Sequence, residues 1–348
     1  MFYDGDVIKK IINWDNSGLY EHREIDTELL TRNRQFILPK TAKGKEKKIT
    51  PTNLLAPIPS GCILYITFYP LIRARNVRNC IELPITDYED VKSITDLRKW
   101  LENYIKTCPA DYFEKVHRMR TMVHRTIKYK VGDIFRFEID REHYGYGIII
   151  GKIHELLKYG VFLEDHPMRN LMTVPILTRI YFIKTKNKNL TVEELSRIEL
   201  LPADCMSDNE IIWGTHEIVG RKTLNEKDID FPIHIGCRRN GNGSELYFGW
   251  GSGLRKIAKF NLDVLPEKIK NGDFNNTGVS LGLNIGALKR KLKGESEYNR
   301  FRDILHPENR QIKDEIFKLF GLPSQLNFDD FNRENNGMTK AEYVKLNS

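Results

Sequence analysis

Side chains that can do chemistry are present in this chain, but their spacing does not assemble a recognised catalytic site. Gly145, Gly147 and Gly151 form a Gly-x-Gly-x-x-x-Gly pattern, in which the third glycine lies one position too late for a dinucleotide-binding turn. The apolar residues between the last two glycines favour a strand, whereas a phosphate site needs backbone N–H groups at the start of a helix. The glycines therefore indicate close backbone packing and not a nucleotide site.

The histidines and cysteines also lack the spacing of a reactive or metal-binding group. His117 and His124 lie seven residues apart and share one helical face, but no third ligand accompanies them. His234 and Cys237 lie three apart on an expected strand, where such side chains point to opposite faces and form no nucleophile–base pair. We therefore expect no catalytic residues, no metal site and no cofactor, with an unrecognised enzyme family as the remaining alternative.

The segment that must position any functional side chain is residues 131–153, which has the pattern of a β-hairpin. Phe135 and Phe137 alternate with Arg136 and Glu138, the period-two signature of a half-buried strand. The run that follows, residues 148–150, is apolar on both faces and is typical of a central strand. We expect the hairpin to close near residues 141–144.

This hairpin resembles the opening of the bacterial polymorphic-toxin immunity protein 26 family, in which a strand with the pattern Gly-Asp, Ile or Val, an apolar residue and Arg is followed by a Tyr-Gly-x-Gly strand. The resemblance extends weakly through an apolar strand at 175–183, and it covers roughly residues 131–250. The matching positions are Gly132, Asp133, Ile134, Phe135, Arg136, Tyr144, Gly145, Tyr146, Gly147, Trp213, Gly214, Ile218, Val219, Gly220 and Pro232. The resemblance implies an antitoxin that binds and neutralises a cognate bacterial toxin domain by direct protein–protein contact, without catalysis.

Interface energy in such a protein is concentrated in aromatic and arginine side chains. The candidate binding residues are therefore Tyr144, Tyr146, Trp213, Trp250 and Arg136. Each aromatic residue has a core-filling role as its alternative, and the alternative for Arg136 is a cross-strand ion pair.

Two other functions stay open. A Gly-Asp pair before a strand in a barrel-like β domain is similar to the SH3-like ribonuclease toxins, in which Arg136 would be the strand-borne catalytic arginine. The basic stretch at 118–125 would suit a nucleic-acid-binding module, a less favoured alternative because aromatic residues are not interleaved at stacking spacing. Retention on RNA or DNA columns that falls with salt would identify such a module.

Composition indicates an ordinary water-soluble protein with its positive charge at one end. The 348 residues carry a formal charge of +8; residues 1–130 hold 23 Lys and Arg against 16 Asp and Glu, leaving 32 against 31 for residues 131–348. Five cysteines, widely spaced and odd in number, favour reduced thiols in a cytoplasm. No signal peptide or membrane-spanning segment is evident, so we expect a cytoplasmic protein. The oligomeric state is not predicted.

The pattern along the chain predicts an α+β fold. We expect a central twisted antiparallel β-sheet or partly open barrel, flanked by a helix-rich N-terminal region and a helical C-terminal tail. The predicted domains are 1–127, 128–270 and 271–348. Individual expected elements are a short helix at 6–14, strands at 35–39 and 62–69, helices within 87–104 and 110–126, a hairpin at 231–239 and 245–250 closed by Asn-Gly turns, helices within 286–320 broken at His306-Pro307, and a short helix after 337.

Overall fold

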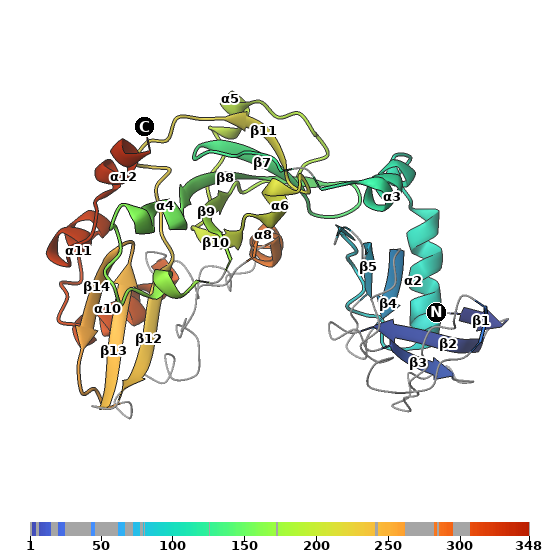
Figure 1. Ribbon diagram of the computed structural model, residues 1–348, viewed down its shortest axis with the longest axis horizontal. Helices are drawn as coiled ribbons and strands as arrows, with labels where there is room; N and C mark the ends of the chain where they lie inside the picture. Colours follow the sequence, from blue (N-terminus) through green and yellow to red (C-terminus); the bar gives the residue numbers. More distant parts are fainter. Residues whose placement is uncertain are drawn as a thin grey trace. The chain divides into compact units, whose positions relative to one another are not determined.

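The computed structural model describes residues 2–4, 7–14, 20–24, 43–45, 62–66, 72–76, 79, 81–124, 126–171, 173–240, 243–261, 282–283, 285–294 and 307–347. The chain forms two compact units (Figure 1). Unit 1 consists of residues 1–124 with 138–142, and unit 2 consists of residues 125–137 with 143–348. The tip of the hairpin that begins the central β domain therefore belongs to unit 1.

The described residues of unit 1 form two small antiparallel sheets and two helices. The first sheet has the order β1 (Phe2–Asp4), β2 (Val7–Trp14), β3 (Tyr20–Glu24), and the second has β4 (Cys62–Ile66), β5 (Ile72–Asn76), β6 (Glu82–Leu83). The helix expected at 6–14 is wrong, because Val7–Trp14 form β2. The strand expected at 62–69 is confirmed by β4 over Cys62–Ile66. Residues 67–69 and the strand expected at 35–39 lie outside the described residues.

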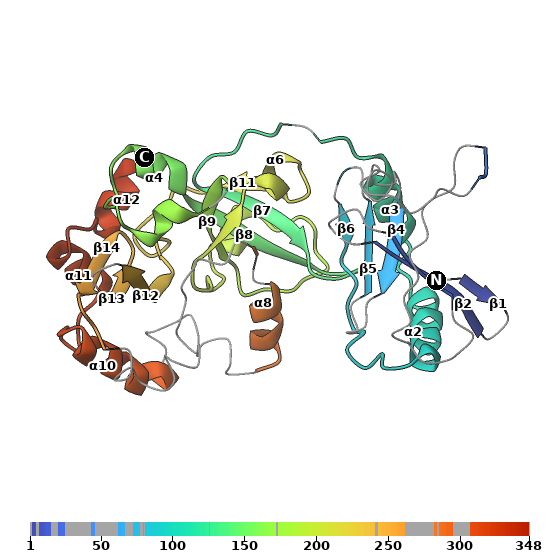
Figure 2. The same ribbon diagram turned by 60° about the horizontal axis from the view of Figure 1, so that its bottom comes forward.

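Both helices expected in unit 1 are confirmed, as α2 (Ile94–Lys106) and α3 (Tyr112–Thr121). Ser93 is the N-cap of helix α2, and its side chain accepts the backbone N–H of Asp96 in a reciprocal capping box, an arrangement that satisfies two backbone donors at the helix start. Its buried Leu97 packs with Ile72 of β5 and with Val91, and Figure 2 shows α2 beside the β4–β5–β6 sheet.

Unit 2 is built on a five-stranded antiparallel sheet with the order β10-β9-β8-β7-β11. The strands are β7 (Asp133–Glu138), β8 (Tyr144–Lys152), β9 (Pro175–Ile180), β10 (Asp204–Ser207) and β11 (Glu217–Arg221), and the helical segments between them are α4 (Ile153–Lys158), η1 (Pro167–Asn170), α5 (Val192–Leu195) and α6 (Asn209–Ile212). The sheet is open, with β10 and β11 as its end strands, and it does not close into a barrel.

A three-stranded sheet and the C-terminal helices complete unit 2. Strands β12 (Ile233–Asn240), β13 (Gly243–Trp250) and β14 (Gly253–Ile257) pair antiparallel in that order, which confirms the hairpin predicted from the Asn-Gly turn. The other elements among the described residues are α8 (Ile285–Leu292), η3 (Pro307–Asn309), α10 (Arg310–Leu319), α11 (Phe328–Glu334) and α12 (Lys340–Leu346). The predicted break before α10 lies partly outside the described residues.

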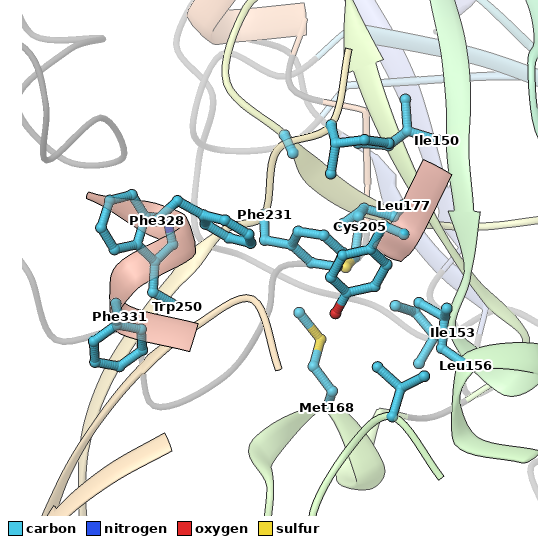
Figure 3. Packing of buried hydrophobic residues seen from close by; sticks show 14 of the residues in the cluster. Ile150, Ile153, Leu156, Met168, Leu177, Cys205, Phe231, Trp250, Phe328 and Phe331 are labelled. Carbon is cyan, nitrogen blue, oxygen red and sulfur yellow. The ribbon is translucent and has the colours of Figure 1, made fainter. Parts of the chain in front are cut away.

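One hydrophobic core joins the two sheets of unit 2 to the C-terminal helices. It contains β-sheet residues such as Ile150 and Leu177 together with Phe328 and Phe331 of α11. Figure 3 shows Trp250 of β13 beside these two phenylalanines, with ring centroids 5.4 Å and 6.2 Å from it. The predicted α+β class with a helical C-terminal region is confirmed. The three domain boundaries stay a prediction, and no helix among the described residues could span a membrane.

Candidate partner-binding surface

The two glycines of the Tyr-Gly-x-Gly strand make room for two aromatic rings. A Cβ atom on Gly145 would lie 2.4 Å from Cζ of Phe137, and one on Gly147 would lie 2.4 Å from Cζ of Phe135. Carbon atoms in contact normally stay about 3.5–4.0 Å apart, so only glycine lets β8 lie directly beside these rings. Both phenylalanines are buried, and the motif therefore encodes close packing between β7 and β8.

The Gly-Asp pair at the start of β7 has a structural role as well. Gly132 has a φ of +89°, a left-handed conformation that glycine adopts without steric cost. The carboxylate of Asp133 is almost fully buried; it accepts the backbone N–H of Lys130 and forms an ion pair with Arg221, N–O distance 2.6 Å. This bond raises the pKa of Arg221. The ion pair between Asp133 and Arg221 therefore links β7 to the end strand β11.

The Trp-Gly and Val-Gly positions also shape the backbone. Gly214 follows α6 with a φ of +76°, as expected of the residue that ends a helix in the left-handed conformation. Its N–H donates to the carbonyl of Ile211. Gly220 lies where a Cβ atom would come 2.8 Å from a methyl group of Val192 on α5. The glycines of the matched motifs thus build the scaffold on which other side chains are displayed.

The structure places the five candidate binding residues in two different environments. Tyr144, Tyr146 and Trp250 are buried, with exposed fractions of 4%, 0% and 3%. A partner cannot touch these three side chains in this conformation. Trp213 and Arg136 are partly exposed, which leaves them as the two members of the set that reach the surface.

Arg136 joins three segments of unit 2. Its guanidinium donates to the carbonyl of Lys188 and forms an ion pair with Glu217 of β11, N–O distance 2.5 Å. It also lies over the ring of Tyr144, 5.2 Å from the centroid. The cross-strand ion pair considered as the alternative role of Arg136 is therefore present. Its side chain is 15% exposed, against 54% for Glu217.

The segment that Arg136 holds is a lysine-rich loop at residues 184–190, here called the lysine loop. Thr185 pairs with Tyr144 through backbone hydrogen bonds in both directions, 2.8 and 3.1 Å. The hydroxyl of Tyr146 donates to the carbonyl of Asn187, 2.8 Å, and accepts the N–H of Leu190. The loop then continues into α5 against Gly220. It therefore crosses one face of the sheet from β8 past β7 to β11, and it covers the two tyrosines.

Lys184, Lys186 and Lys188 are exposed on this loop. These lysines were not among the candidate binding residues, although two features of the sequence indicate an exposed, positively charged segment here. The lysines alternate with polar residues, and no Asp or Glu occurs between Asp165 and Glu193. The nearly neutral total for residues 131–348 conceals this local concentration of positive charge.

The buried histidines of unit 2 serve packing. His166 and His234 are fully buried with ring centroids 6.2 Å apart. Desolvation lowers their pKa values to about 3 and about 4, so both rings are neutral at pH 7. The ring of His216 stacks on Phe135 at 5.7 Å, and desolvation lowers its pKa to about 4. Among the described residues, no group of three or more His, Cys, Asp or Glu side chains is placed to hold a metal ion.

Comparison with known proteins gives one family for the part of the chain just described. Neither the curated proteins nor the solved structures contain a match to this chain. The matched family segment runs from the turn before β7 to the end of β12, and so contains the hairpin, Trp213, the lysine loop and β11. The resemblance expected from the hairpin motifs is confirmed: residues 130–240 match the model of the Immunity protein 26 family, Imm26.

Proposed function

We propose that this protein is an immunity protein, an antitoxin that binds and neutralises a cognate bacterial toxin domain by direct contact in the cytoplasm. The observation that carries the proposal is the Imm26 match over residues 130–240. The packing of Gly145 and Gly147 against two buried rings supports it, because it gives the matched motif a physical role in this fold.

The toxin would contact exposed side chains within the matched residues 130–240. Arg136 and Trp213 keep their place as candidate contacts, since both reach solvent. Tyr144, Tyr146 and Trp250 support this surface from the core, and their truncation would act through stability, at about 3–5 kcal/mol for a buried tryptophan. A partner contact here requires no cofactor or metal.

The ribonuclease alternative assigns catalysis to Arg136. The contacts of this guanidinium with the Lys188 carbonyl and with Glu217 favour a positioning role. In a ribonuclease the same group would contact a phosphate oxygen of the substrate.

A growth assay tests the proposed function and this alternative together. Cells that express the toxin domain encoded beside this gene should grow only when this protein is co-expressed, and the two proteins should co-purify. Expression of this protein alone should be harmless. The proposal fails if this protein alone stops growth and cleaves RNA, with loss of both effects in Arg136→Ala, or if no neighbouring gene product binds it.

A further inference from the structure

The end strand β11 and the lysine loop lie next to each other on unit 2. Glu217 of β11 and the carbonyl of Lys188 bind the same guanidinium, that of Arg136. Val192, two residues after the end of the loop, lies against Gly220 of β11. A molecule that contacts one of these two elements is therefore within reach of the other.

Strand β11 has one edge without a neighbouring strand among the described residues, because it ends the sheet order. The opposite end of the sheet is different: Gly282 donates its N–H to the carbonyl of Cys205 in β10, 3.0 Å. The side chains of Ile218 and Val219 on β11 are only partly buried. An edge of this kind offers backbone donors and acceptors to an extended segment of another chain.

The positive charge near this edge comes from the lysine loop, because Glu217 and Arg221 of β11 each form an ion pair within unit 2. Five cations lie between Asp165 and Glu193, a stretch without carboxylates. Two of them, Arg169 and Arg179, donate to backbone carbonyls within unit 2. The other three, Lys184, Lys186 and Lys188 of the lysine loop, are exposed, and the ammonium group of Lys188 also lies over the ring of Tyr144, 5.6 Å from its centroid.

We propose that β11 and the lysine loop form the surface that receives the toxin, and that the toxin contributes an extended acidic segment. The segment pairs with the free edge of β11 and extends over the lysine loop, where its carboxylates lie against Lys184, Lys186 and Lys188. This inference rests on the proposed function and names the partner surface for it. Opposite charge steers association and fixes the register of the added strand, while backbone hydrogen bonds hold it.

The same features disfavour a second copy of this chain as the occupant. An irregularity in the pairing of β11 with β7, at Ile218/Gly220, distorts the edge, and such bulges act against self-pairing of end strands. A second copy would also bring its own lysine loop toward this one, and like charges held close repel.

Hydrogen exchange with the adjacent-gene toxin domain as the probe tests the proposal. On complex formation the amides of residues 217–222 and 184–190 should become protected. A complex that forms with protection confined to other segments would overturn this surface and leave the proposed function standing. Absence of any complex would overturn both.

Charge reversal gives a second test on the full-length protein. Lys184→Glu with Lys186→Glu and Lys188→Glu should slow association by about 10- to 100-fold at low salt and flatten its salt dependence. The matched control reverses Arg310, Lys318 and Lys345, which are exposed on α10 and α12, and should leave the association rate within about threefold. Equal effects of the two triple variants would contradict the proposal, as would competition by RNA or a concentration-dependent dimer that protects β11 without the toxin.

Discussion

Substitution of Gly147 by alanine should destabilise unit 2 because it removes the space that the ring of Phe135 occupies. The new Cβ atom would lie 2.4 Å from Cζ and 2.9 Å from Cε2 of that ring. Since carbon atoms normally stay about 3.5–4.0 Å apart, the ring or strand β8 must move by about 1 Å. Overpacking of this kind costs about 1–3 kcal/mol, and the reduced entropy of the unfolded chain offsets about 0.4–1 kcal/mol of that.

Gly151 provides the matched control in the same strand. A Cβ atom there would lie 3.6 Å from its nearest neighbour, Cβ of Leu177, which is an ordinary contact. Gly151→Ala should therefore leave the free energy of unfolding unchanged or raise it by up to about 1 kcal/mol. Urea unfolding should be followed by circular dichroism and by hydrogen exchange at β8 amides, so that any loss is assigned to unit 2.

A double variant separates the ring contact from other effects of the added methyl group. Leucine at position 135 has no atom equivalent to Cζ, so Phe135→Leu should reduce the cost of Gly147→Ala by about 1 kcal/mol or more in a double-mutant cycle. Equal stability of the Gly147→Ala and Gly151→Ala proteins would refute the packing explanation of the motif, and so would a cycle with no coupling.

Three further predictions concern the pH dependence of stability, the sites of proteolysis, and the metal and cofactor content of the purified protein. His166 and His234 are buried and neutral in the folded protein, with pKa values of about 3 and about 4, whereas the pKa of an unfolded histidine is about 6.5. The stability that depends on their neutral form is therefore complete above about pH 6.5. It should fall toward pH 4 by up to about 1.4 kcal/mol per pH unit for each ring. Urea melts between pH 7 and 5 should show this slope, reduced in His234→Gln but not in His117→Gln, an exposed control. Brief proteolysis should cut first within 126–130 and 271–278, yet the C-terminal fragment should stay bound because its helices share the core of unit 2; its release would contradict that core. Native mass spectrometry with metal analysis should give the mass of the polypeptide alone, and stoichiometric zinc or iron would be the contrary result.

The local parts of the fold could be predicted from the sequence, since their determinants lie within a few residues. Alternation and turn glycines identified the hairpins, and a helix was predicted within 87–104, where the structure starts α2 with the capping box of Ser93 and Asp96. The error at residues 6–14 has a definite cause. Val7, Ile8, Ile11 and Ile12 fit one helical face, but these β-branched residues favour strands, and their pairing with β1 and β3 decided the outcome.

The candidate surface was harder to predict because its exposure is determined by segments far apart in the sequence. Tyr144 and Tyr146 lie at the start of β8, next to the turn of the hairpin, and nothing in the neighbouring sequence indicates which segment would cover them. The lysine loop, some 40 residues later, folds over both of them. Trp250 is covered by α11, which lies still further along the chain. Burial of these three rings is a tertiary property that the local pattern does not contain.

Stoichiometric titration of the toxin's activity with this purified protein tests the central claim most directly. If the protein neutralises the toxin by direct contact, the activity should fall linearly and vanish near equimolar protein, and it should return when the complex is separated. Full loss of toxin activity at a small fraction of an equivalent would mean that this protein acts as an enzyme. No loss at a large excess would mean that it is not the antitoxin of that toxin.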